Sequence, residues 1–193
     1  EMGHVQWPCP TLDHPGTPYL YKDNQFDTPT GKGQLFAAPW RAPAETPDAD
    51  FPLVLCTVRE VGHYSCRSMT GNCAALQSLA DEPGRVQMNP ADAQRLGIAE
   101  GQLVWVRSRR GKVITRASIS ERINAGAVYM TYQWWIGACN ELTQDNLDPI
   151  SKTPETKYCA VQLEAIEDQR WAEDFAASAY QSMKSRLINA VNV

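Results

Sequence analysis

The chain has 193 residues, of which 43% are hydrophobic and 21% are charged, and its formal net charge is −4. This length allows one domain of ordinary size that buries roughly 70% of its unfolded surface, so a metal or a disulfide is not required for stability. The acidic balance argues against a general binder of nucleic acid or anionic membranes, because both use a basic field. No apolar run is long enough to cross a membrane. We therefore expect no nucleic-acid partner and no membrane span.

The six cysteines are scattered along the chain. They form no CxxC pair, and no spacing indicates zinc or an iron–sulfur cluster. Most lie among apolar or small residues, which favours packed thiols in a reducing compartment. The sequence therefore predicts a cytoplasmic protein without metal ligands of its own. Because the first residue is not methionine, we also expect a piece of a longer protein.

Residues 1–48 contain most of the prolines, several glycines and few apolar runs. This composition predicts an extended arm, and its aromatic residues favour packing on another body over disorder. Two segments, 19–21 and 34–37, are candidates for a pair of short strands, with a turn at 28–33 before the second. Trp7 and Trp40 are expected to cover apolar surface.

A buried strand is predicted over residues 51–58, because the run is almost unbroken apolar sequence with several β-branched residues. The residues that follow, up to Gly71, crowd hydrogen-bond donors and acceptors between glycines that let the backbone turn. A strand that leads into such a loop is a common way to build a ligand site on a rigid support. The ordinary alternative is a polar connection in which His63 is structural or faces solvent.

Two short helices interrupt the strands. The first is predicted over residues 72–80, and the second follows a short strand over residues 86–88. In the second helix, Asn89 is a favourable cap, Pro90 fits the first helical position and Gly97 ends the helix.

The rest of the chain alternates strands with tight turns and ends in one long helix. The basic turn at 108–112 is interpreted as a solvated hairpin tip, with contact to an anion as the less favoured alternative.

No GxGxxG or GxxxxGK[ST] phosphate loop occurs. Short strands with few helices predict a small closed β barrel, mainly β with some α. We expect strands over residues 103–106, 113–120, 127–132 and 157–163, and a helix over residues 166–189 whose apolar face holds Ile166, Trp171, Phe175, Ala179, Met183 and Leu187. The predicted domains are an arm over 1–48, a barrel over 49–165 and a C-terminal helix over 166–193.

Four stretches of the sequence resemble a known family. In chain order they read PLVLCTVREVGHYSCRSMTGN, NPADAQRLGIAEGQLVWVRSRRGKVITRASIS, GAVYMTYQWWIGACNELT and DPISKTPETKYCAVQLE. They resemble the C-terminal domain of the molybdopterin oxidoreductases, and within that superfamily most of all the large (alpha) subunit of formate dehydrogenase. The resemblance covers nearly all of the chain, including the GxxYLY and FDTPTGKG segments of the arm. It is specific because four separate motifs occur in family order with similar spacing.

The resemblance implies a double-psi β barrel that covers one side of a bis-(molybdopterin guanine dinucleotide) cofactor. The residues implied to bind the dinucleotide follow the first barrel strand, follow a later strand, or precede the last strand. They are Thr57, Arg59, Glu60, His63, Ser65, Tyr132, Gln133, Asn140 and Lys157. Thr156 departs from the family pattern, which has an aromatic residue there, so no stacking role is carried over to it.

The residue types suit such a ligand. A pyrophosphate needs cationic or backbone N–H donors, which Arg59 and Lys157 offer. The N–H groups of guanine suit a carboxylate such as Glu60. The alternatives are a surface ion pair between Arg59 and Glu60, and a packing role for Trp134 and Trp135.

In the family, the cysteine or selenocysteine that ligates molybdenum, its neighbouring histidine and the cysteines of a [4Fe–4S] cluster lie in earlier domains, and none has a match here. The resemblance therefore implies the cofactor-binding part of a molybdenum or tungsten formate dehydrogenase, an oxidoreductase that converts formate to carbon dioxide, with no activity in this chain alone. The implied partners are the remaining domains of the same polypeptide and an electron-transfer subunit. Two alternatives stay open: the same domain from another molybdopterin oxidoreductase, such as a nitrate reductase, and a free-standing barrel that serves as a protein-interaction module.

Overall fold

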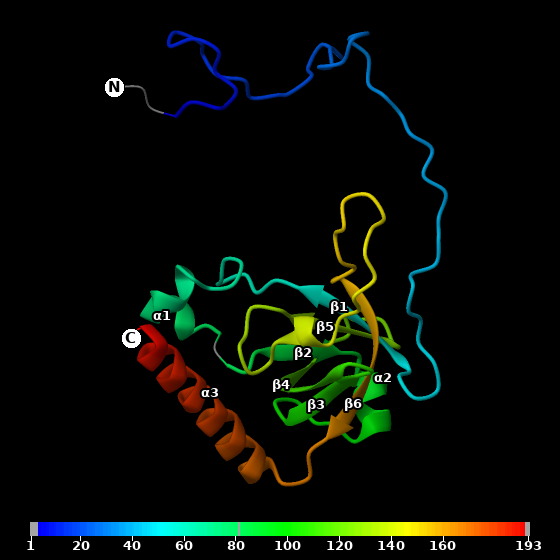
Figure 1. Ribbon diagram of the computed structural model, residues 1–193, viewed down its shortest axis with the longest axis vertical. Coiled ribbons are helices and arrows are strands. Elements are labelled where there is room, and N and C mark those ends of the chain that lie inside the picture. Colours follow the sequence, from blue (N-terminus) through cyan, green and yellow to red (C-terminus); the bar gives the residue numbers. More distant parts are fainter. Residues whose placement is uncertain (1–3, 81, 192–193) are drawn as a thin grey trace. The chain divides into compact units, whose positions relative to one another are not determined.

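The computed structural model describes residues 4–80 and 82–191 (Figure 1). The chain divides into two compact units, Glu1–Arg41 and Ala42–Val193, and each is described by itself. All of the described helices and strands belong to the second unit.

Six strands of the second unit close into a barrel (Figure 1). They are β1 (Leu53–Val58), β2 (Arg85–Met88), β3 (Leu103–Ser108), β4 (Gly111–Ile119), β5 (Ala127–Thr131) and β6 (Tyr158–Ala165). Around the barrel they run in the order β1-β5-β2-β4-β3-β6, and β6 pairs with β1 to complete the ring. The pairs β1–β5 and β2–β4 are parallel, and the other four pairs are antiparallel. The closed β barrel predicted from the sequence is therefore confirmed.

The hydrophobic core fills the barrel because each strand turns alternate side chains inward. In β1, Leu53 and Leu55 are almost fully buried, and in β2 Val86 and Met88 are fully buried. Burial of a side chain of this size stabilises the fold by roughly 1.5–3 kcal/mol. The core therefore provides a rigid support for the polar loops that leave the strand ends.

The helix α2 (Pro90–Leu96) confirms the predicted start and stop signals. The Asn89 side-chain oxygen accepts a hydrogen bond from the Ala91 amide at 2.9 Å. Gly97 has a φ of 66°, a left-handed conformation that favours glycine, and the Ile98 amide then donates to the Ala93 carbonyl at 2.9 Å.

The helix predicted over residues 72–80 is shorter than expected. The structure has a 3₁₀ turn, η1 (Thr70–Asn72), followed by a single helical turn, α1 (Ala74–Gln77). Cys73 is extended between the two, with φ −100° and ψ 108°. This extended residue prevents the two segments from joining into one helix, so the predicted boundaries are wrong at both ends.

The long helix α3 (Gln169–Val191) packs on the barrel through small residues. Ala172 and Ala176 are buried, whereas Trp171 and Phe175 are 47% and 37% exposed. The predicted apolar face is therefore wrongly centred: its middle is formed by Ala172 and Ala176, which bring the helix close to the barrel. The rings of Trp171 and Phe175 pack beside Trp105 at the edge of the contact. None of the described helices is both long and apolar enough to span a membrane.

No strand occurs in the described residues of the first unit, so the predicted pairing of residues 19–21 with 34–37 is wrong. Tyr21 and Asn24 have φ values of 56° and 55°, and the Asn24 amide donates to the Tyr21 carbonyl at 2.9 Å. The chain therefore turns where a strand would have to run straight. The turn predicted at 28–33 is confirmed by a hydrogen bond from the Thr28 hydroxyl to the Lys32 carbonyl at 2.8 Å.

The basic turn between β3 and β4 is paired with acidic residues of the same unit. The Glu45 carboxylate accepts two hydrogen bonds from the Arg110 guanidinium at 2.7 and 2.9 Å, and it also accepts one from the Ala160 amide at 2.7 Å. Arg109 pairs with Asp48. The hydrogen bond from Arg110 lowers the pKa of the Glu45 carboxyl, although partial burial acts in the opposite direction. The turn is thus tied to the segment that enters the barrel.

Candidate functional site

Three chain segments meet at one end of the barrel because of the strand register. β1 and β5 are parallel neighbours with Val58 opposite Thr131, so the residues that follow both strands leave the barrel at the same end (Figure 1). β6 runs antiparallel to β1 with Cys56 opposite Tyr158, so the residues that precede β6 lie at this end too. We call this end the rim and define it as residues 57–60, 131–133 and 156–157.

Six of the residues predicted to bind a ligand belong to the rim: Thr57, Arg59, Glu60, Tyr132, Gln133 and Lys157. The Arg59 Nε donates to the Tyr132 hydroxyl at 2.9 Å, and the Lys157 Nζ lies 5.3 Å from the centre of the Tyr132 ring. The Thr57 hydroxyl donates to the Thr156 carbonyl at 2.8 Å. Within the described structure, neither Arg59 nor Lys157 has a carboxylate partner. The alternative of a surface ion pair between Arg59 and Glu60 is therefore not formed there. The rim therefore presents two cations around one tyrosine ring.

Gln133 fastens the start of the polar loop to the barrel. Its side chain is 2% exposed; the oxygen accepts from the Glu60 amide at 2.5 Å, and the nitrogen donates to the His63 carbonyl at 2.7 Å. The Glu60 carboxylate has no hydrogen-bond partner among the described residues, and it lines a hollow of about 240 Å³. Gln133 thus orients the backbone of a residue whose carboxylate is available to a ligand.

His63 is 4% exposed and uses both ring nitrogens within the loop. Its Nε2 lies 2.8 Å from the Ala80 carbonyl and its Nδ1 lies 3.0 Å from the Thr70 hydroxyl. Because a carbonyl only accepts, Nε2 carries a proton, and in the neutral ring Nδ1 accepts from Thr70. His63 therefore has a structural role, and its predicted contact with a ligand stays a prediction. Ser65 lies in the same loop, half-buried, with a φ of 45°.

Asn140 is exposed in the 3₁₀ turn η2 (Cys139–Glu141), where its carbonyl accepts from the Thr143 hydroxyl at 2.8 Å. In the described part of the chain, no hydrogen bond joins its side chain to the rim. The structure thus brings Thr57, Arg59, Tyr132 and Lys157 together, connects Glu60, Gln133 and His63 by hydrogen bonds, and leaves Ser65 and Asn140 outside this network.

Arg67 and Glu82 were not predicted, although they form a buried ion pair behind the rim. Their side chains are 5% and 6% exposed. The Arg67 Nε also donates to the Gln133 carbonyl at 2.7 Å. The sequence signal was weak, because Arg67 was one of many polar residues in its loop and Glu82 lies 15 residues further on, beyond α1, at no spacing that indicates contact.

Of the six cysteines predicted as mostly packed thiols, Cys139 and Cys159 are buried, Cys9 and Cys56 are half-buried, and Cys66 and Cys73 are exposed. The thiols of Cys56, Cys139 and Cys159 do not supply the chemistry of the site. Burial raises the pKa of Cys56, that of Cys139 to about 12 and that of Cys159 to about 11. Such thiols stay protonated at neutral pH and are poor nucleophiles and metal ligands. Among the described residues, no group of three or more His, Cys, Asp or Glu side chains is arranged to hold a metal ion.

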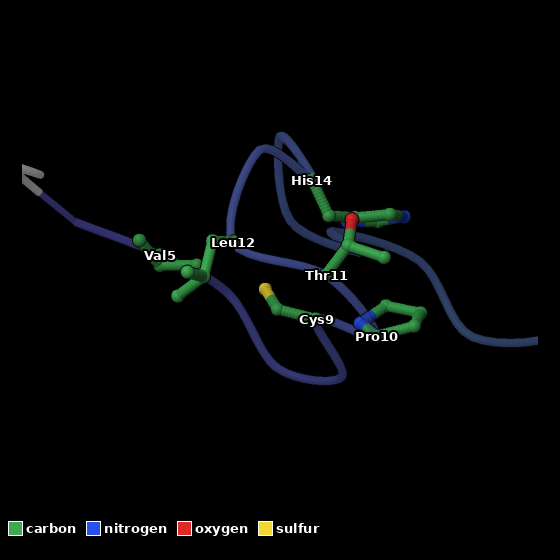
Figure 2. Close-up of a pocket in the computed structure, with 6 residues that line it drawn as sticks. All are labelled: Val5, Cys9, Pro10, Thr11, Leu12 and His14. Atoms are coloured by element: carbon green, nitrogen blue, oxygen red, sulfur yellow. The ribbon is translucent and has the colours of Figure 1, made fainter.

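A separate hollow of about 330 Å³ lies within the first unit (Figure 2). Figure 2 shows Cys9 and His14 among the side chains that line it. The Cys9 thiol donates to the Gln6 carbonyl at 3.3 Å, and the His14 Nδ1 accepts from the Gly16 amide at 3.0 Å. Both groups therefore shape the loop itself, and the rim is the stronger candidate for a ligand site.

The chain is thus a closed six-stranded barrel with cationic and aromatic side chains gathered at one end, which makes that end a candidate ligand site. Residues 53–160 match the family model described as Molydopterin dinucleotide binding domain. The match runs from the first residue of β1 into β6, includes the whole rim and covers more than half of the chain. The chain therefore belongs to the family of molybdopterin dinucleotide-binding domains, which confirms the resemblance found in the sequence.

Within this family, the chain is similar to formate dehydrogenase sequences. The chain is 60% identical to formate dehydrogenase H of Escherichia coli (strain K12) over 98% of the chain and 27% of that protein. It is 41% identical to the F420-dependent formate dehydrogenase subunit alpha of Methanocaldococcus jannaschii over 86% of the chain and 24% of that protein. The chain thus spans about a quarter of the length of these relatives. Among solved structures, acetylene hydratase from Pelobacter acetylenicus shares the fold, with a TM-score of 0.58 and 19% identity over 74% of this chain and 25% of that one.

Proposed function

We propose that the rim binds the dinucleotide part of a molybdopterin cofactor. The observation that carries this proposal is the pair of cations around Tyr132. Arg59 and Lys157 both contact this side chain, and neither is neutralised by a carboxylate in the part of the chain that the structure describes. Such a donor set favours an anionic ligand, and membership of the dinucleotide-binding family selects a pyrophosphate among the anions.

The chemistry of the rim residues fits such a ligand. Arg59 bonds to Tyr132 through Nε, so its two terminal nitrogens keep hydrogens for phosphate oxygens. Lys157 adds three rotatable donors, and the Glu60 carboxylate is the acceptor that the N–H groups of a guanine require. When bound, the cofactor supplies the metal-centred redox chemistry, while residues of this chain bind and orient it.

The other predicted residues take different parts in this proposal. Thr57 and Gln133 hold the backbone of the rim through their hydrogen bonds, and His63 holds the loop. Ser65 and Asn140 lie outside the hydrogen-bonded network, and we assign them to parts of the ligand that extend beyond the rim.

We further propose that the barrel is of the double-psi type. Its two parallel pairs, β1–β5 and β2–β4, join strands that are not consecutive in the chain, and β5 lies beside β2 so that the two pairs are neighbours. This arrangement supports the interlocked topology that the family resemblance implied.

For the parent protein, we propose a formate dehydrogenase with bis-(molybdopterin guanine dinucleotide) and molybdenum or tungsten. The 60% identity to formate dehydrogenase H supports this assignment. We assign the remaining domains of the polypeptide, a [4Fe–4S] cluster within them, an electron-transfer subunit and a cytoplasmic location to the same proposal. Trp7 and Trp40 are 82% and 84% exposed, which suits an arm that packs on such domains. This chain alone would then be inactive.

The test uses the complete polypeptide that carries this chain. Guanine nucleotide released by acid, bound metal and formate-dependent dye reduction are measured together for wild type, Arg59→Ala and Arg122→Ala. Arg122 is an exposed arginine in the turn before β5, at the other end of the barrel, and serves as the matched control. A charge-assisted hydrogen bond contributes about 1.5–3 kcal/mol, so Arg59→Ala should weaken retention of the nucleotide roughly tenfold or more.

Two results would contradict the proposal. Equal retention of guanine nucleotide in the two variants would exclude Arg59 as a ligand. A wild-type polypeptide that contains neither metal nor guanine would favour the alternative of a protein-interaction module.

A further inference from the structure

A buried ion pair lies directly behind the rim. Arg67 belongs to the loop that follows β1, and Glu82 belongs to the segment that leads into β2, and both side chains are almost fully buried. Buried pairs seldom add much stability over well-packed apolar residues, because both charges must leave water. Stability alone therefore does not explain the presence of the Arg67–Glu82 pair at this place.

Glu82 holds the backbone of the turn that follows β5. One carboxylate oxygen, which also pairs with Arg67, accepts from the Trp135 amide at 2.8 Å. The other oxygen accepts from the Ile136 amide at 2.9 Å. One carboxylate thus fixes two consecutive amides of the turn and a guanidinium of the facing loop.

Arg67 continues the connection toward the rim. Its Nε donates to the Gln133 carbonyl at 2.7 Å, and its guanidinium carbon lies 4.5 Å from the centre of the Trp134 ring. The Gln133 side chain in turn bonds the Glu60 amide and the His63 carbonyl. An unbroken series of contacts therefore leads from Glu82 through the β5 turn to the first residues of the polar loop.

We propose that Arg67 and Glu82 are positioning residues for dinucleotide binding. They set the spacing between the two halves of the rim, Arg59 and Glu60 on one side and Tyr132 on the other, through the backbone atoms to which they bond. The inference rests on the proposed function of the rim. Glu82 lines the same hollow as Glu60, but both of its carboxylate oxygens accept hydrogen bonds from groups of the chain, and Arg67 donates to Glu82 and to the Gln133 carbonyl. The loss of either charge therefore changes affinity through geometry.

The matched control is Asp92, a second buried carboxylate that holds a backbone amide. Asp92 is 5% exposed, accepts from the Gly126 amide at 2.7 Å and pairs with Arg95 at 2.8 Å. Gly126 directly precedes β5, so Asp92 acts at the opposite end of the same strand. Asp92→Asn and Glu82→Gln therefore remove the same kind of interaction at the two ends of β5.

The experiment measures the complete polypeptide, prepared without cofactor, with guanosine diphosphate as the probe. The dissociation constant and the unfolding midpoint are determined for wild type, Glu82→Gln, Arg67→Lys and Asp92→Asn. We expect Glu82→Gln and Arg67→Lys to raise the dissociation constant at least tenfold. The dissociation constant of Asp92→Asn should stay within twofold of the wild-type value. Its unfolding midpoint should fall by about as much as that of Glu82→Gln.

The possible failures are distinguishable. If the wild-type polypeptide does not bind the probe, the proposed function of the rim fails and this inference fails with it. If wild type binds, and Glu82→Gln and Arg67→Lys bind as well as Asp92→Asn does, the positioning role is wrong and the pair is only structural. Arg67→Lys keeps the positive charge, so it decides the question even if Glu82→Gln does not fold.

Discussion

Replacement of Gln133 by alanine is the sharpest test of how the rim is held. The side chain is 2% exposed, and it makes two hydrogen bonds to backbone groups of the facing loop, one to the Glu60 amide and one to the His63 carbonyl. Gln133→Ala would leave both backbone groups without this partner. An unsatisfied buried polar group costs about 1–3 kcal/mol, so we expect a total loss of about 3 kcal/mol in the free energy of unfolding.

Urea unfolding of the 193-residue chain measures the loss in stability, and hydrogen exchange of the Glu60 amide measures the loss of the bond itself. Gln169→Ala is the control. The Gln169 side chain, at the first residue of α3, also bonds backbone groups: its oxygen accepts from the Leu103 amide at 2.8 Å, and its nitrogen donates to the carbonyls of Leu103 at 2.9 Å and Ile166 at 2.7 Å. Both variants should be destabilised, and the Glu60 amide should exchange faster only in Gln133→Ala. Equal exchange at Glu60 in the two variants would refute the reasoning.

Two further predictions concern other parts of the barrel. Glu45→Gln should cost about 1–2 kcal/mol at neutral pH, because it removes the charge that pairs with Arg110. The pKa of Glu45 is lowered in the folded state, so wild type should keep its full advantage above the ordinary pKa of a glutamate and lose it as the pH falls through the lowered value; a difference in urea midpoint that does not change with pH would contradict this. Gly84→Ala should destabilise the chain by about 3 kcal/mol or more, because the φ there is +72° and a Cβ would lie 2.0 Å from the Trp134 ring nitrogen. Gly126→Ala, at a φ of +82° with no atom within 4 Å, should cost only about 1 kcal/mol, and similar melting temperatures for these two variants would show that the contact is absent.

Features that depend on neighbouring residues were predictable from the sequence. The helix α2 begins and ends where Asn89, Pro90 and Gly97 predict, because capping and left-handed conformations are decided within a few residues. The strands were recognised by their apolar, β-branched runs. The convergence of Arg59, Tyr132 and Lys157 was expected from the family resemblance, and the register of β1, β5 and β6 brings these residues together.

Features that depend on contacts between distant segments were not predictable in this way. The helical periodicity of α3 marks an apolar stripe, yet only the approach to the barrel decides that Ala172 and Ala176 are buried and that Trp171 lies at the edge. The helix predicted over residues 72–80 is interrupted because Cys73 adopts an extended conformation. Local propensity is a small term, and tertiary packing overrides it when larger areas are buried.

By itself, the sequence determined the family of this protein, the strands of its barrel and the residue types of its rim, because these are written in local runs and motifs. Only the tertiary structure decided that Arg67 forms an ion pair with Glu82 and that both ring nitrogens of His63 form hydrogen bonds within its own loop. It also decided that Asn140 lies outside the hydrogen-bonded network of the rim. The physical reason is that a buried charge or polar group is held by whichever partners the closed barrel brings within hydrogen-bond distance, and those partners lie far away in the sequence.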